Sequence, residues 1–187
     1  MENSFVLKGN LAFSKDMTHI ETIENGYLVC VDGLSKGAYK ELPEKYAGLP
    51  VYDYGNHLIV PGMTDLHLHA PQYTYRGIGM DLELLDWLST HTFPEEAKYS
   101  DLEYAKKAYS YFSYDLKRCF TTRACIFATL HTDATIELMD QVEETGVIAY
   151  VGKVNMDRNG GENLEEASAD ASIEATLDWQ AYRRQVC

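Results

Sequence analysis

The sequence predicts an α/β protein in which a β-rich segment precedes an incomplete (β/α)8 TIM barrel. Strand-like stretches separated by turns fill residues 1–60, whereas residues 61–187 alternate between strand-like and helix-like patterns. A closed eightfold barrel needs about 250 residues, roughly twice what the second region offers. We therefore expect two domains, residues 1–60 and residues 61–187, with about three strand-helix units in the second.

The first domain is predicted to contain short strands joined by turns. Asp32-Gly33 stands between two alternating segments, and this dipeptide is a strong hairpin signal. The strands are expected at residues 4–13, 26–31, 38–42 and 51–54.

In the second domain, hydrophobic periodicity switches between the strand period and the helix period. Strands are expected at residues 63–69, 122–130 and 147–156, and helices at residues 81–89, 101–118, 133–144 and 164–180. Asp81 is expected in the first turn of its helix, where a negative charge suits the helix dipole. Gly146 indicates where the helix at 133–144 stops.

Composition and charge exclude several classes of partner. The 187 residues include 16 Lys and Arg against 29 Asp and Glu, which gives a net charge of −13 at pH 7. Such a chain repels phosphate backbones and anionic lipid, so neither nucleic acid nor a membrane is an expected partner. No apolar stretch approaches the roughly 18 residues that span a bilayer. The scattered cysteines are typical of a reducing compartment, so we expect a cytoplasmic protein; they are Cys30, Cys119, Cys125 and Cys187.

The most informative motif is D-x-H-x-H at the end of the strand at 63–69. Because side chains alternate along a strand, Asp65, His67 and His69 are expected on one face, where both imidazoles could reach a single metal ion. Neutral imidazole suits Zn²⁺ and also Fe²⁺. The alternative is that two histidines merely alternate on a half-exposed strand. The carboxyl ends of barrel strands are where active sites lie, which favours the metal interpretation.

These motifs together resemble the guanine deaminases of the amidohydrolase superfamily. Pro61-Gly62 followed by D-x-H-x-H resembles the first barrel strand of that superfamily. Gln72, the W-L pair at 87–88 and T-F-P-E-E at 92–96 make the resemblance more specific. Further matching runs follow in order at residues 70–73, 76–79, 121–123, 127–131 and 152–157. The resemblance extends from about residue 8 to about residue 178.

The resemblance implies an amidohydrolase barrel preceded by part of a small β-sandwich. It also implies zinc-dependent hydrolysis of guanine to xanthine and ammonia, a step of purine catabolism, since zinc supplies hydroxide at neutral pH. His67 and His69 correspond to the first two zinc ligands, and Gln72 corresponds to the residue that hydrogen-bonds the purine. Full-length members of the family are expected to form homodimers.

Other groups that the resemblance implies lie beyond residue 187. They are two further metal-binding histidines, a glutamate that shuttles protons, an aspartate beside the metal and an Arg-Phe pair that holds the base. No general acid or base is therefore assigned within the chain, and we expect residues 1–187 alone to be inactive. Two alternatives stay open: another amidohydrolase acting on a purine or pyrimidine base, and a non-catalytic remnant that binds metal at most.

Two further features are interpreted from the residues alone. His131 ends a predicted strand, so it either lines the site or serves as a hydrogen-bonded structural histidine. The acidic residues around the predicted last helix are expected on a solvated helix face; they are Glu162, Glu165, Glu166 and Asp170.

Overall fold

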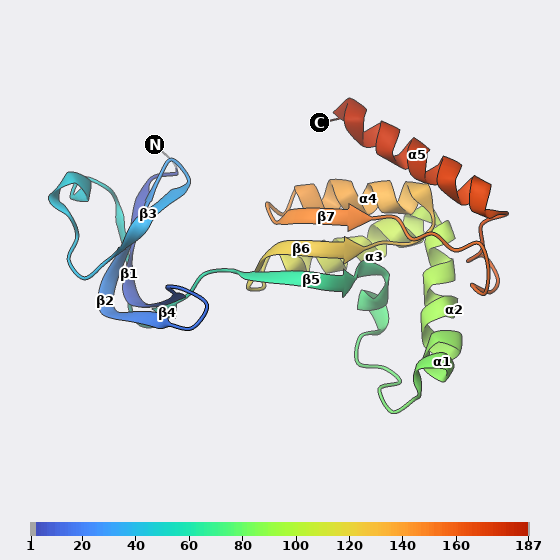
Figure 1. Cartoon of the computed structure of the whole chain (residues 1–187), viewed down its shortest axis with the longest axis horizontal. Helices are drawn as coiled ribbons and strands as arrows, with labels where there is room; N and C mark the ends of the chain where they lie inside the picture. Colours follow the sequence, from blue (N-terminus) through green and yellow to red (C-terminus); the bar gives the residue numbers. More distant parts are fainter. Residues whose placement is uncertain (1–2, 187) are drawn as a thin grey trace. The chain divides into compact units, whose positions relative to one another are not determined.

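The computed structural model describes residues 3–186 and shows a mixed α/β protein made of two compact units (Figure 1). The first unit runs to Pro61 and the second begins at Gly62. Each unit has a sheet of its own. Within residues 3–186, no helix is both long enough and apolar enough to cross a membrane. Cys30, Cys119 and Cys125 are free thiols, and Cys187 lies outside the described residues.

The first unit is a four-stranded sheet in the order β3-β2-β1-β4. Strand β1 pairs antiparallel with β2 and parallel with β4, and β2 pairs antiparallel with β3. Val6, Leu11, Ile23 and Val29 are its buried apolar side chains. The strands are β1 (Phe5–Ser14), β2 (Ile20–Val31), β3 (Leu34–Tyr39) and β4 (Val51–Ile59).

Two strands of this sheet are longer than the sequence predicts. β2 begins at Ile20, where it pairs with the last residue of β1, and β4 continues to Ile59. The extra length depends on cross-strand hydrogen bonds, which local composition does not reveal. β3 begins at Leu34, directly after the Asp32-Gly33 turn. Both turn residues have positive φ, +53° and +76°, so the predicted tight hairpin turn is confirmed.

The second unit is built on a parallel sheet in the order β5-β6-β7, with helices α3 and α4 packed on one face (Figure 1). The strands are β5 (Met63–His69), β6 (Thr121–Phe127) and β7 (Ile148–Gly152), and the helices are α3 (Leu102–Leu116) and α4 (Thr132–Glu143). Their apolar side chains form one core. Its central members are Tyr109, Phe112, Ala124, Ile126 and Leu138.

The region between β5 and α3 contains several short helical turns where the sequence predicts one helix at 81–89. A 3₁₀ turn, η2 (Ala70–Tyr75), follows β5, and helix α1 covers only Leu84–Trp87. A π-helical turn at Leu88–Thr92 continues it, and α2 (Phe93–Glu96) and a further 3₁₀ turn precede α3. The residue before α1 is Glu83, so Asp81 lies outside the helix. The prediction that Asp81 lies in the first turn of a helix and interacts with its dipole is therefore wrong.

The last helix, α5 (Ala169–Val186), begins five residues later than predicted. Leu164, the predicted first helical residue, is instead a buried loop residue with 1% of its surface exposed. The carboxylate of Glu165 accepts a hydrogen bond from the backbone N–H of Gly160, and the backbone N–H of Glu166 donates to the carbonyl oxygen of Met156. These loop contacts replace the hydrogen bonds that a helix would make.

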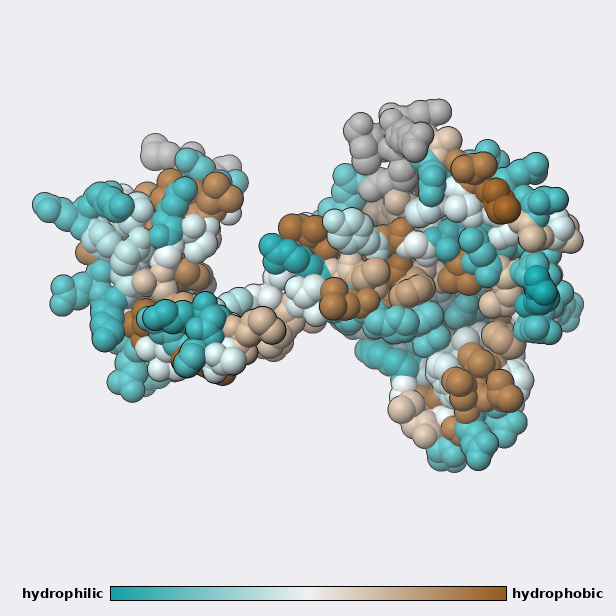
Figure 2. Space-filling model, in the orientation of Figure 1, coloured by the Kyte–Doolittle hydropathy of each residue, from teal (hydrophilic) through white to brown (hydrophobic). Residues whose placement is uncertain are grey.

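The face of the β5-β6-β7 sheet opposite the helices is open. Ala124 and Ile126 of β6 are buried against the helices, whereas Arg123, the residue before Ala124, is exposed. On β7, Ile148 and Tyr150 are exposed, with 58% and 78% of their surfaces accessible. Hydrophobic side chains accordingly interrupt the polar surface of this unit (Figure 2). We refer to this side below as the open face.

Candidate active site

His67 and His69 lie at the end of β5 with their imidazole rings side by side. The ring centres are 5.0 Å apart and the ring planes meet at 69°. Two imidazoles that each bind one tetrahedral metal ion through a nitrogen at about 2 Å have ring centres roughly 5 Å apart. The spacing therefore fits a shared metal ion. Burial, and to a lesser extent His67, lowers the pKa of His69, which favours the neutral imidazole that a metal requires.

Asp65 does not share the face of the two histidines as the alternation predicts. The pairing of β5 with β6 changes register after Asp65, because β5 accommodates one extra residue there. Asp65 pairs with the buried Ala124, whereas His69 pairs with Phe127. The carboxylate of Asp65 accepts a hydrogen bond from the backbone N–H of His67 at 3.1 Å. This bond ties Asp65 to the irregular part of the strand.

Phe127, the last residue of β6, packs against both histidines. Its ring centre lies 4.9 Å from that of His69 with the planes at 17°, which is a stacked arrangement. It lies 4.7 Å from the ring centre of His67, with the planes at 53°. No signal in the sequence distinguishes this residue from an ordinary aromatic core residue, so sequence reasoning gave it no role of its own.

Gln72 lies in η2, the turn that directly follows β5, and it shares a cavity with His69. The cavity has a volume of about 650 Å³. Side chains from β5, η2 and α3 line it, among them Asp65, His69, Gln72, Tyr73 and Leu116, and so does Arg76, which directly follows η2. A molecule in this space can therefore contact the Gln72 amide and reach toward the histidine at the strand end.

Glu95 holds the turn that carries Gln72. Its carboxylate accepts hydrogen bonds from Thr74 at 2.7 Å, from Lys98 at 2.5 Å and from the hydroxyl of Tyr104. Burial raises the pKa of the Glu95 carboxyl, but these three partners outweigh burial, so the pKa lies below its ordinary value. The ionised carboxylate therefore joins η2 to the start of α3.

Glu96 lies beside Gln72 and is buried, with 8% of its surface exposed. Burial raises the pKa of its carboxyl group to about 7, and the Gln72 side chain offsets part of the rise. In the sequence, Glu95 and Glu96 stand out only as part of the T-F-P-E-E motif that resembles the guanine deaminases. The structure shows that this motif supports the turn that bears Gln72.

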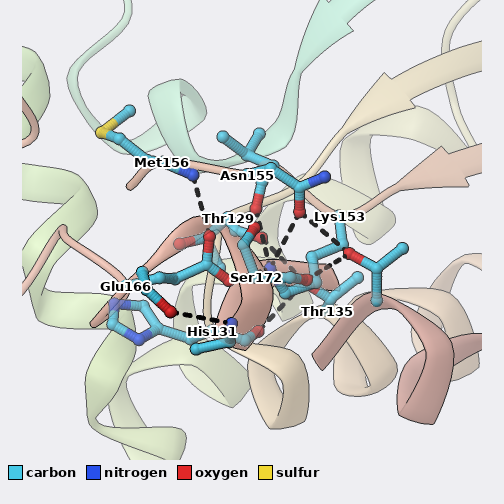
Figure 3. Close-up of polar contacts among 12 residues, drawn as sticks. Thr129, His131, Thr135, Lys153, Asn155, Met156, Glu166 and Ser172 are labelled. Atoms are coloured by element: carbon cyan, nitrogen blue, oxygen red, sulfur yellow. Dashed lines mark hydrogen bonds and ion pairs between the residues drawn. The ribbon is translucent and has the colours of Figure 1, made fainter. Parts of the chain in front are cut away.

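His131 follows β6 and lies in a partly buried polar group that we call the Lys153 cluster (Figure 3). Lys153 Nζ contacts Glu166 Oε1 at 2.5 Å and also donates to the carbonyl oxygen of Val154 and to Asn155 Oδ1. Burial, and then the Lys153 charge, lowers the pKa of His131, while Glu166 opposes this. The members of the cluster are Thr129, His131, Lys153, Asn155 and Glu166.

Glu166 is therefore not on a solvated helix face, contrary to the sequence-based expectation. Its side chain is 9% exposed and that of Lys153 is fully buried. Burial raises the pKa of the Glu166 carboxyl, but hydrogen bonds from Lys153 and from the backbone N–H of Met156 outweigh it, and the pKa lies below its ordinary value. His131 Nε2 is buried and has no hydrogen-bond partner within residues 3–186, and His131 does not line the cavity that His69 shares with Gln72.

The comparison with protein families gives a clear match. The sequence pattern of the Amidohydrolase family matches residues 58–182, well over half of the chain. The chain belongs to the amidohydrolase family. The matched range includes all the site residues described above, from Asp65 on β5 to Glu166 before α5.

Several proteins similar to this amidohydrolase chain are named as guanine deaminases. The chain is 40% identical over 129 residues to a guanine deaminase of Dictyostelium discoideum, a match that covers 69% of this chain and 28% of that protein. It is 39% identical over 132 residues to a guanine deaminase of Escherichia coli, covering 69% of this chain and 30% of that protein.

A solved structure shows the same relationship in three dimensions. The crystal structure of guanine deaminase from C. acetobutylicum, which has guanine bound in its active site, aligns with a TM-score of 0.88 and 46% sequence identity. The alignment covers 95% of this chain and 42% of that chain. This amidohydrolase chain thus spans less than a third of the two relatives and less than half of the solved enzyme.

Within residues 3–186, no group of three or more His, Cys, Asp or Glu side chains could hold a metal ion. The histidine pair on β5 offers two imidazole rings at a spacing that suits one metal ion. A catalytic zinc ion takes three protein ligands. Sequence reasoning selected both histidines, and the structure places them together.

Proposed function

We propose that this chain supplies the first part of a guanine deaminase active site, which converts guanine to xanthine and ammonia by hydrolysis. The proposal rests on one observation. The end of β5, where His67 and His69 lie side by side, and the turn that carries Gln72 meet at the same cavity. The similarity to the guanine-bound enzyme supports the choice of guanine over other bases. In this proposal β5, β6 and β7 are the first strands of an incomplete (β/α)8 barrel, and the first unit is part of a small β-sandwich.

His67 and His69 would hold a zinc ion in this site, with iron as the alternative metal. When bound, the ion would lower the pKa of a water molecule and so supply hydroxide near neutral pH. The neutral state of His69 and the 5.0 Å spacing of the rings support this assignment.

Gln72 would bind the purine, because a side-chain amide offers both a donor and an acceptor to a heterocycle that has both. Glu95 would keep the turn in place through its bonds to Thr74 and Tyr104. Asp65 would support the strand end through the backbone of His67. His131 is better explained as a member of the Lys153 cluster than as a residue that touches the base.

The remaining ligands and the general acid or base would come from residues that this sequence does not contain. For this reason we expect residues 1–187 alone to bind zinc weakly and to release no ammonia from guanine. We further propose that the complete enzyme acts in the cytoplasm as a homodimer. A non-catalytic remnant is the competing interpretation, and the experiment below separates the two.

A chimeric enzyme tests the proposal. In it, this chain replaces the matching part of the C. acetobutylicum guanine deaminase, so that all missing groups are supplied. We expect ammonia release from guanine but not from adenine or cytosine. His67→Ala should abolish activity, whereas His19→Ala in the first unit, where the ring bonds to exposed Asp16, should change little. Gln72→Ala should cost about 1 to 3 kcal/mol in kcat/KM by leaving a purine hydrogen bond unmade.

Two results would refute the proposal. A folded, zinc-loaded chimera without guanine turnover would favour the remnant interpretation. Equal turnover of cytosine would show that the substrate is another base.

A further inference from the structure

Phe127 is the aromatic residue that contacts both members of the histidine pair. The stacked arrangement with His69 and the tilted contact with His67, at 4.9 and 4.7 Å between ring centres, place one ring against two imidazoles that are themselves 5.0 Å apart. Aromatic rings at such separations attract each other beyond their shared burial. The three rings therefore form one packed group on the open face.

The sheet directs the Phe127 ring toward β5. Phe127 pairs with His69 on one side and with Gly152 on the other, at the ends of their three strands. Gly152 has no side chain, and a Cβ placed on it would meet no atom within 4 Å. The ring of Phe127 therefore has no cross-strand packing partner on β7, and its contacts lie with the histidines.

The backbone that follows Phe127 is also held from the β7 side. The N–H of Ala128 donates to the carbonyl oxygen of Gly152, and the N–H of Val154 donates to that of Thr129, both on the β7 side. A rigid support of this kind can hold another side chain in one orientation.

We propose that Phe127 is a positioning residue, which holds the imidazoles of His67 and His69 in the orientation in which both can bind one metal ion. The inference rests on the proposed metal pair, and it adds a residue that does not itself touch the metal or the base. Without the ring, each imidazole would regain rotamer freedom that metal binding must then remove, and this lowers affinity.

The experiment compares substitutions at Phe127 in the 187-residue chain. Phe127→Leu removes the ring and keeps an apolar side chain, whereas Phe127→Tyr keeps the ring. Ile126→Val is the matched control, because Ile126 is the neighbouring β6 residue and is buried on the opposite face. Zinc affinity is measured by competition with a coloured chelator, and the melting temperature is recorded for each variant. NMR of histidine-labelled protein without metal gives the ring-proton shifts of His67 and His69, assigned with the two His→Ala variants.

We expect Phe127→Leu to weaken zinc binding about three- to tenfold, an effect of the size of one aromatic contact. Phe127→Tyr should retain the parent affinity, and Ile126→Val should retain it even if the melting temperature falls. Without metal, the His69 ring protons should be shifted upfield in the parent chain by the stacked ring, and Phe127→Leu should abolish this shift.

Parent-like zinc affinity in Phe127→Leu would overturn the proposal, as would the absence of an upfield shift of His69 in the parent chain. Equal loss of affinity in Ile126→Val and Phe127→Leu would also overturn it, since general destabilisation would then explain both. If zinc moves neither histidine signal in the parent chain, the proposed metal pair is refuted. The ring-proton shifts then decide by themselves whether Phe127 orients the imidazoles.

Discussion

Glu96 illustrates how a single buried carboxyl group can make the stability of the folded chain depend on pH. It lies at the end of α2, beside Gln72, and burial raises the pKa of its carboxyl group from 4.5 to about 7. In the unfolded chain the group loses its proton near pH 4.5, whereas in the folded chain it keeps the proton until about pH 7. The free energy of unfolding therefore falls progressively as the pH rises from 4.5 to about 7.

From this pKa difference we predict that Glu96 lowers the free energy of unfolding by about 3 kcal/mol between pH 4.5 and pH 7, with no further loss above that window. Glu96→Gln, which stays neutral, should remove this contribution and so be more stabilising at pH 8 than at pH 4. Urea unfolding at the two pH values measures it. Glu103→Gln, on the exposed surface of α3, serves as the control. An identical effect of Glu96→Gln at both pH values would contradict the prediction.

At the scale of elements, the segment between β7 and α5 is held by a buried ion pair. Lys153 lies directly after β7, and Glu166 lies three residues before α5. Their contact at 2.5 Å, together with the bond from the Met156 N–H to Glu166, connects the two ends of an irregular loop. Because both side chains are removed from water, neither charge can be left without its partner at low cost.

We predict that Lys153→Met destabilises the chain by about 3 to 5 kcal/mol, because the buried Glu166 carboxylate loses its counter-charge. Adding Glu166→Gln should recover part of the loss, since a neutral amide needs no counter-charge. Lys106→Met, which breaks the exposed pair of Lys106 with Glu103, should cost less than about 1 kcal/mol. Urea unfolding of the four proteins checks this, and equal costs for the two lysine substitutions would show that burial is unimportant here.

At the scale of the whole molecule, the chain contains two separate sets of buried side chains. Leu11 of β1 belongs to the first unit and is 3% exposed, and Leu138 of α4 belongs to the second and is fully buried. Units that each have their own core can unfold as separate cooperative units.

We therefore predict that Leu11→Ala and Leu138→Ala, each costing about 2 to 5 kcal/mol, destabilise different parts of the chain. In hydrogen-exchange mass spectrometry, Leu11→Ala should accelerate exchange in β1 and β2 and leave α4 and β6 unchanged. Leu138→Ala should do the reverse. Acceleration throughout the chain by either variant would mean that the two units unfold together.

The sequence by itself determined those features that depend on neighbouring residues along the chain. The predicted strand at 63–69 is β5, and the predicted helices at 101–118 and 133–144 are α3 and α4 within a few residues. Local chemistry explains this success: Asp101 caps α3 by accepting from the N–H groups of Glu103 and Tyr104, and Gly146 takes the positive φ that ends α4. The spacing of His67 and His69 was enough to select both.

Only the tertiary structure decided features that depend on partners distant in the sequence. The change of register between β5 and β6 removed Asp65 from the face of the histidines, and tertiary packing buried Glu96. Glu166 became half of a buried ion pair because Lys153 meets it across a loop. Phe127 was placed against the histidines by the pairing of β6 with β5. Strand register and the loss of water around a charge are set by which elements pack together, and local sequence patterns do not contain that information.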